Sequence, residues 1–158
     1  ANGELVLLEE QDRGRWDRAR IEEGRRVLGR ALALAPPGPY ALQAAIAAVH
    51  VDAARADETN WSRIAELYDQ LAAVHPSPVV DLNRAVAVAM SAGVESGLLL
   101  VDRIEGLDGY HLLHATRADL LRRCGRQTEA AAAYERALEL TTSPVERSFL
   151  ERRLAETR

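Results

Sequence analysis

The chain has 158 residues, about the size of one domain, and 47% of them are hydrophobic, which is enough to bury a sizeable core. Only 4% are aromatic, whereas 28 residues are alanine and 22 are leucine, a composition that favours helices over sheets. All 20 residues in the Lys+Arg total are arginine, which excludes P-loop and Schiff-base lysines, and the net charge of −4 argues against a free-standing nucleic-acid binder.

The cellular compartment follows from the cysteine content and from the absence of targeting signals. Cys124 is the single cysteine, so an internal disulfide is impossible and the chain suits a reducing cytosol. The sequence shows no signal peptide and no run of about 18 apolar residues. We therefore expect a cytoplasmic protein. The chain starts at Ala1 without an initiator methionine, as expected for a piece of a longer protein.

Proline and glycine divide the chain into a series of expected helices. Before them, Leu5–Leu8 follows an Asn2-Gly3 turn signal and is expected to be extended or to form half of a hairpin. The expected helices are residues 16–35, 40–56, 61–75, 78–90, 94–104, 110–124, 128–140 and the segment from 144 towards the C-terminus. Short loops between them predict an all-α fold of about eight antiparallel helices. The helix at 78–90 is almost entirely apolar and must be covered on most sides.

A repeat underlies this series of helices. Its pattern is a small or apolar residue, a large apolar residue four positions later, another small or apolar residue after three more, and a terminator. The pattern fits Gly24, Leu28 and Ala31; Ile64, Tyr68 and Leu71; Gly97, Val101 and Ile104; and Ala130, Tyr134 and Ala137. The first members are 40, 33 and 33 residues apart, and two of these spacings match a helical-hairpin repeat of about 34 residues.

The repeat predicts that these positions pack where helical hairpins cross, because small residues allow close approach and large ones fill the space between hairpins. The last unit resembles the tetratricopeptide consensus. We therefore expect residues 16–158 to form a right-handed tetratricopeptide-like solenoid, with residues 1–15 as an extended segment packed on it. An ordinary helical bundle with coincidental spacing is the alternative.

Two polar groups are candidate interaction residues. Asp81, Asn83 and Arg84 interrupt the apolar helix, and buried polar side chains need partners. They could grip a peptide backbone or carboxylate on a concave face, or they could bridge to the neighbouring hairpin. Asp12, Arg13 and Trp16 belong to a stretch rich in hydrogen-bonding groups just before the first helix. They are expected to anchor the N-terminal segment on the stack, with a ligand contact as the alternative.

Catalysis has no clear candidate in the sequence. His111 and His114 could share a metal, but no third ligand is suitably spaced, so structural or surface roles are expected. Cys124 has arginine neighbours but no partner histidine, and no Gly-x-Ser-x-Gly motif occurs. The arginines at 122, 123 and 126 have acids nearby and are expected to lie on a solvated helix face. The sequence therefore predicts a non-enzyme with no metal and no cofactor.

Several longer motifs are similar to those of a known family. They are GELVLLEEQDR at 3–13 followed by WD at 16–17, GPY at 38–40, QAAIAA at 43–48, LYD at 67–69, SPVV at 77–80, LNRAVAVA at 82–89 and GYHLLHA at 109–115. In this order, and over nearly the whole chain, they resemble the C-terminal tetratricopeptide-like extension of a group of extracytoplasmic-function RNA polymerase sigma factors. Asn2 and Gly14 depart from the family pattern, and the promoter-melting region and helix-turn-helix of such factors are absent from these residues.

The resemblance implies a regulatory protein-interaction domain that controls sigma-factor activity in bacterial transcription initiation. Its implied partners are the sigma domains of the same polypeptide, RNA polymerase or another protein, and a peptide ligand is also conceivable. The fragment itself is expected to contact neither nucleic acid nor a membrane. A stand-alone adaptor that binds a peptide of an unrelated protein is the alternative function. A metal-dependent enzyme that uses His111 and His114 is a third hypothesis.

Overall fold

The computed structural model describes residues 5–157, and in that range the chain forms eight α-helices and two single-turn 3-10 helices without any strand. The α-helices are α1 (Arg18–Leu34), α2 (Pro39–Asp52), α3 (Trp61–Val74), α4 (Pro78–Ala92), α5 (Val94–Val101), α6 (His111–Arg123), α7 (Gln127–Leu140) and α8 (Pro144–Ala155), and the 3-10 helices are η1 (Arg13–Arg15) and η2 (Ala56–Glu58). The expected all-α class is confirmed. The Asn2-Gly3 turn lies outside the described residues, and Leu5–Leu8 continues into a turn rather than a hairpin strand.

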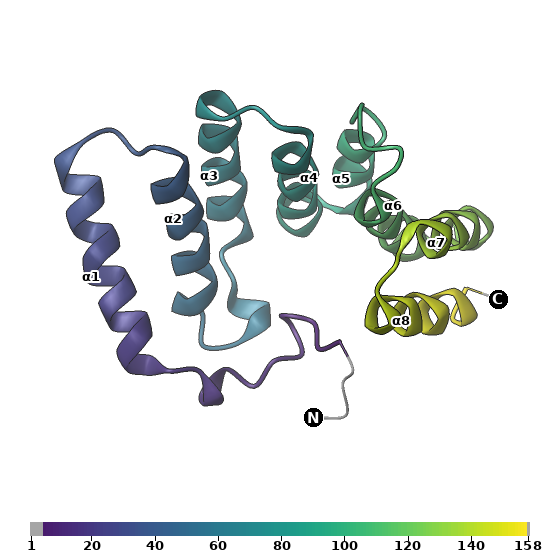
Figure 1. Ribbon diagram of the computed structural model, residues 1–158, viewed down its shortest axis with the longest axis horizontal. Helices are drawn as coiled ribbons and strands as arrows, with labels where there is room; N and C mark the ends of the chain where they lie inside the picture. The colour runs from purple at the N-terminus through teal and green to yellow at the C-terminus, as the bar shows by residue number, and fades with distance from the viewer. Residues whose placement is uncertain (1–4, 158) are drawn as a thin grey trace.

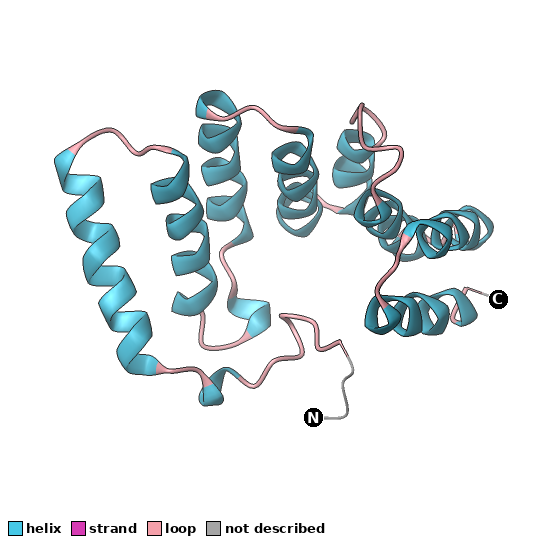
Figure 2. Cartoon of the chain, viewed as in Figure 1, coloured by secondary structure: helices cyan, strands magenta, loops and turns pink. Residues whose placement is uncertain are grey.

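Helices that follow one another in the chain also pack against one another (Figure 1). Helices α1 to α5 stand side by side from left to right in the view of Figure 1, and α6, α7 and α8 close the right-hand end. Short loops join most neighbours, as Figure 2 shows. The N-terminal segment runs back from α1 beneath α2 and α3 towards the side where α6 and α8 lie.

Local side chains and proline define where the helices begin. The carboxylate of Asp17 accepts a hydrogen bond from the Arg20 amide at 3.1 Å, and Asn60 accepts one from the Arg63 amide at 3.0 Å. These contacts satisfy amides that have no partner within the helix. A proline occupies the first position of α2, α4 and α8, where its missing N–H costs nothing. Helix α6 ends at Arg123, and Gly125 follows two residues later with a φ of 76°, which is strained for other residues.

Helix α4 joins two clusters of buried side chains. Leu42, Ile64 and Leu71 are the largest fully buried members of the first cluster, which α2, α3 and one face of α4 form. The second cluster lies between the other face of α4 and helices α5 to α8, with Leu121 and Tyr134 as its largest fully buried members. The expected cover of the apolar α4 is therefore present over the middle of the helix, whereas Val79 and Met90 near its two ends stay exposed.

The predicted crossing positions differ between the units of the repeat. The structure buries Ile64, Leu71, Gly97, Val101, Ala130, Tyr134 and Ala137, and leaves Leu28, Tyr68 and Ile104 partly exposed. The prediction is wrong for Gly24 and Ala31, which are both exposed. No atom lies within 4 Å of a Cβ built on Gly24. The physical reason is that α1 stands at one end of the described stack and packs chiefly on α2, so the rest of its surface is uncovered.

We expect Ala130→Leu to lower the free energy of unfolding by about 1 to 3 kcal/mol, because an enlarged side chain must displace close-packed neighbours. Ala130 is 0% exposed and belongs to the larger cluster. Ala132, on the solvent side of the same helix, provides the matched control. Urea unfolding followed by circular dichroism measures both variants. Equal midpoints for Ala130→Leu and Ala132→Leu would contradict the packing of α7 described here.

Candidate functional site

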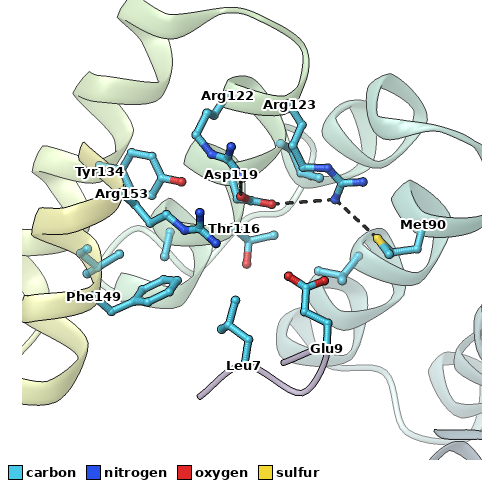
Figure 3. A pocket seen from close by; sticks show the side chains of 14 residues that line it. Leu7, Glu9, Met90, Thr116, Asp119, Arg122, Arg123, Tyr134, Phe149 and Arg153 are labelled. Carbon is cyan, nitrogen blue, oxygen red and sulfur yellow. Dashed lines mark hydrogen bonds and ion pairs between the residues drawn. The ribbon is translucent and has the colours of Figure 1, made fainter. Parts of the chain in front are cut away.

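The described residues enclose two adjoining hollows, which we call together the inner groove. The first hollow, of about 510 Å³, lies between α4, α6, α7, α8 and the N-terminal segment (Figure 3). The second, of about 600 Å³, lies between the N-terminal segment, the α2–α3 loop, α4 and α6. The two hollows share Leu7, Glu9, Val86, Met90, Asp119 and Arg123. The shared residues form a common wall, so the two hollows lie directly beside one another.

Charged side chains from α6 form a network at the first hollow. Asp119 accepts a hydrogen bond from Nη2 of Arg122 at 2.6 Å, and its second oxygen lies 3.8 Å from Nη1 of Arg123. Arg123 also donates to the sulfur of Met90 on α4, 3.5 Å away. The contact with Asp119 raises the pKa of Arg122, so this guanidinium stays charged at every pH that the protein would meet. One carboxylate therefore faces two permanent positive charges.

Polar atoms with no partner lie beside this network. The Nε atoms of Arg122 and Arg153 are shielded from solvent and make no hydrogen bond within residues 5–157, whereas the buried Tyr134 hydroxyl lies against the Arg122 guanidinium. Burial raises the pKa of the Tyr134 phenol, while Arg122 acts in the opposite direction. The phenol is therefore protonated at neutral pH. Buried donors without partners are uncommon in proteins, because each one costs about 1 to 3 kcal/mol.

Arg13 fixes the N-terminal segment to the α2–α3 region. Its side chain is buried, and Nη1 donates to the backbone carbonyls of His50 and Ala53, both at 2.8 Å. Nη2 donates to Oγ1 of Thr59 at 3.3 Å, and the guanidinium lies 5.1 Å from the centre of the Trp16 ring. The two carbonyls lie at the C-terminal end of α2, where carbonyls lack helical partners and a positive charge is favourable. This geometry fits an anchor rather than a ligand contact.

Asp12 caps the short 3-10 helix η1 in the same segment. Its carboxylate accepts a hydrogen bond from the Gly14 amide at 2.9 Å and so caps η1. The short helical turn directs Arg13 inward while Asp12 itself stays exposed. Together, the cap and the buried guanidinium set the course of the chain from the groove to α1.

His50 predicts a dependence of stability on pH. Burial, and to a smaller extent Arg13, lowers the pKa of this imidazole below its ordinary value of 6.5. The unfolded state therefore binds more protons than the folded state as the pH falls through about 6.5, and the free energy of unfolding decreases there. We expect His50→Gln to reduce this decrease between about pH 7 and pH 5 in chemical unfolding. His75→Gln, at an exposed position, should leave the decrease unchanged, and an unchanged profile in His50→Gln would contradict the expectation.

The structure does not bring the polar residues of α4 to the inner groove. Asp81 and Asn83 are exposed, and Arg84 forms an ion pair with Asp69 of α3. The expectation of burial is wrong for Asp81 and Asn83, because they lie on the side of α4 that solvent reaches, whereas Leu82 between them faces the core. The ion pair between Arg84 and Asp69 of α3 matches the alternative that these residues bridge to a neighbouring helix. Asp81 and Arg84 instead line a separate hollow near the end of α5.

The histidines and the cysteine have separate environments. Nε2 of His111 lies 3.0 Å from Oε2 of Glu146, and Nε2 of His114 meets the backbone carbonyl of Asp108 at 2.9 Å. Within residues 5–157, no three histidine, cysteine or acidic side chains are grouped so that they could hold a metal ion. Cys124 is partly exposed at the C-terminal end of α6. These positions form no common site with the inner groove.

Sequence reasoning missed the residues that give the groove its chemistry. Arg123 and Arg126 are exposed and paired with acids, as expected for a solvated face. The sequence did not indicate that Arg122 and Arg123 also line the groove together with Arg153. The local signal was weak: Asp119 lies three and four positions before the two α6 arginines. Only tertiary packing brings α8, with Arg153 and Phe149, next to them.

Comparison with known proteins adds one relative. An uncharacterized protein of Rhizobium meliloti (strain 1021) is 44% identical to this chain over 155 residues. The match covers 98% of the chain but 37% of the relative, so the chain spans little more than a third of that protein's length. No family model and no solved structure matches the chain. Between residues 5 and 157, no helix combines the length and the apolar character needed to cross a bilayer.

Proposed function

We propose that this chain is a cytoplasmic protein-interaction domain that regulates a bacterial extracytoplasmic-function sigma factor during transcription initiation. The observation that carries the proposal is the inner groove, an open surface of apolar and charged side chains that is built from several helices and the N-terminal segment. A groove of this kind suits a protein partner. The proposed partner is either the sigma domains of the same polypeptide or RNA polymerase. In this proposal, the chain itself contacts neither DNA nor a membrane.

The proposal includes a finer fold, a right-handed tetratricopeptide-like solenoid over residues 16–158 with residues 1–15 packed on it. Packing between successive helices supports it, as do the small residues at two crossings. At one crossing, Gly97 of α5 approaches Ala89 of α4, and at another Ala130 of α7 is completely buried. The anchor formed by Arg13 supports the division at residue 15.

Two further observations support a domain that works within a longer polypeptide. The resemblance to the sigma-factor extension runs in order through nearly the whole sequence. The Rhizobium relative is far longer than the matched region, which is the organisation that such an extension requires. Neither observation depends on the geometry of the groove.

A binding measurement tests this proposal. The sigma domains of the parent protein, alone and together with core RNA polymerase, are immobilised, and the purified chain is passed over them in biolayer interferometry. We expect saturable binding that is at least tenfold weaker for a chain with Arg122→Ala and Arg123→Ala, since charged contacts in an interface centre contribute strongly. Absence of binding to either target, or a parent protein without sigma domains, would overturn the proposal.

The exposed amide of Asn83 favours a second candidate, a stand-alone adaptor that captures a peptide of an unrelated protein. Asn83 can offer both a donor and an acceptor to a peptide backbone. Affinity purification with wild-type chain and with Asn83→Ala distinguishes the two functions. A partner unrelated to transcription that is retained by wild type and lost with Asn83→Ala would favour the adaptor.

A further inference from the structure

We propose that the first hollow of the inner groove, at Arg122, Arg123 and Arg153, binds an extended protein segment. In this segment, branched apolar side chains such as leucine lie next to carboxylate side chains. This inference rests on the proposed interaction function, because it names the chemistry of the partner that the groove binds. The hollow is a different surface from the one formed by Asp81, Asn83 and Arg84 on α4.

The hollow offers an apolar surface for side chains of the partner. Val86, Leu120, Phe149 and Leu150 contribute to its lining from three helices. The Phe149 ring also lies beneath the Arg153 guanidinium, whose central carbon is 5.3 Å from the ring centre. This stacking holds the charged group beside the apolar surface. A segment that binds here therefore needs apolar side chains next to groups that complement arginine.

The charges favour a carboxylate. Three arginines line the first hollow, whereas Asp119 and Glu9 are the acidic residues in its lining. Arg153 pairs with Glu156, but Arg122 and Arg123 share the single carboxylate of Asp119, so the two α6 arginines carry one positive charge more than their acidic partner. Figure 3 shows Tyr134, Arg122, Asp119 and Arg153 gathered at one side of the hollow. An incoming carboxylate would balance this charge at the Nη groups of Arg122 and Arg123, and charge-assisted hydrogen bonds of this type are the stronger ones.

The N-terminal segment already places the same chemistry against this surface. Its sequence at residues 5–10 is LVLLEE, and Figure 3 shows that Leu7 and Glu9 point towards the hollow. The hollow retains about 510 Å³ with this segment in place, so room for a second extended segment remains beside it. The segment thus indicates which side chains the groove accepts without filling the groove.

The shape of the site favours an extended segment over a small anion. The first hollow adjoins the second at the shared wall, and the second is lined by Trp61 and His50 in addition to Arg13 and Asp57. A single small carboxylate would occupy only the arginine end. An extended peptide could place its carboxylate there and lay apolar side chains along the rest of the groove.

Fluorescence anisotropy with two labelled peptides tests the inference on the full chain. The probe is LVLLEEQD, the sequence of residues 5–12, and its comparison peptide is LVLLQQQD, which lacks two of the three negative charges. We expect the first peptide to bind about tenfold more tightly, and this difference to shrink at high salt. A chain with Leu7→Ser and Glu9→Ser should bind the first peptide about as tightly as wild type, because the peptide enters the space that the segment leaves open.

Matched arginine variants locate the binding. Arg153 and Arg136 each pair with a glutamate three positions later, at 3.0 Å and 2.7 Å, but Arg153 lines the hollow and Arg136 does not. We expect Arg153→Gln and Arg123→Gln each to weaken the binding of LVLLEEQD several-fold, and Arg136→Gln to leave it unchanged. Circular dichroism confirms that each variant is folded.

The outcomes separate this inference from the proposed function. Equal binding of both peptides by wild type and by the double-serine variant, or equal loss with Arg136→Gln, would overturn the inference. Competition by glutarate as effective as that by the peptide would also overturn it in favour of a small-anion site. If the sigma domains bind the wild-type chain and the Arg153→Gln chain equally well, the proposed function stands. In that case the inference about the first hollow fails. If the peptide binds as expected but the sigma domains do not, the proposed function fails.

Discussion

Replacement of Gly97 by leucine is expected to lower the free energy of unfolding by about 3 kcal/mol, one of the largest effects of any single substitution in this chain. A Cβ at position 97 would lie 2.3 Å from the Cβ of Ala89 and 2.7 Å from the carbonyl oxygen of Ala85. Both contacts are far shorter than normal van der Waals distances, and one involves backbone. Helices α4 and α5 must therefore separate to admit any side chain.

Gly24→Leu is the matched control for this prediction. Gly24 is also a helical glycine, but no atom lies within 4 Å of the added Cβ and the residue is exposed. Leucine has the higher helix propensity, so we expect no loss of stability or a gain of up to about 1 kcal/mol. Urea unfolding of both variants makes the comparison. A stable Gly97→Leu variant, or equal destabilisation by both substitutions, would contradict the close crossing of α4 and α5.

Replacement of Arg13 by methionine is expected to cost about 2 to 4 kcal/mol of stability. Methionine approximates the length of the apolar part of the side chain but cannot donate hydrogen bonds. The carbonyls of His50 and Ala53 then lose their charged donor, and Thr59 loses its partner on Arg13. The N-terminal segment loses its attachment at the same time.

Hydrogen exchange distinguishes this local effect from a general loss of stability. In Arg13→Met, we expect faster exchange of amides in residues 53–60 and in the N-terminal segment, at a denaturant concentration where α7 is still protected. Arg15→Met is the control, because Arg15 is exposed and lies in the same short 3-10 helix. Unchanged exchange of residues 53–60 in Arg13→Met would contradict the anchoring role.

Local sequence signals predicted all eight helices and most of the buried repeat positions, although α2 ends at Asp52 and α5 at Val101, before the expected residues 56 and 104. Proline at the first helical position and glycine just after the last one mark helix boundaries. They do so through their own backbone preferences, which do not depend on the rest of the fold. The spacing of small residues correctly located Gly97 and Ala130 because those helices are covered on several sides. The same spacing failed at Gly24, because a periodic pattern does not reveal which helix stands at the end of the described stack.

The groove could not be predicted in the same way. Its arginines come from α6 and α8, which are about 30 residues apart in the sequence. Arg122 and Arg123 of α6 have an acidic residue nearby, which suggested a solvated helix face. Whether such a pair faces solvent or a groove depends on the packing of α6 against α7 and of α7 against α8. Asn83 shows the opposite error, since its apolar neighbours suggested burial although its own position on α4 faces solvent.

Run-off transcription with the parent protein and core RNA polymerase is the most direct measurement of the proposed function. Three forms of the parent are compared: the intact protein, the protein without this domain, and the protein with Arg122→Ala and Arg123→Ala. We expect removal of the domain to change transcript yield at least several-fold, and the double substitution to reproduce a large part of that change while the protein stays folded. Equal transcript yield from the intact protein and the protein without the domain would contradict a regulatory role in transcription initiation.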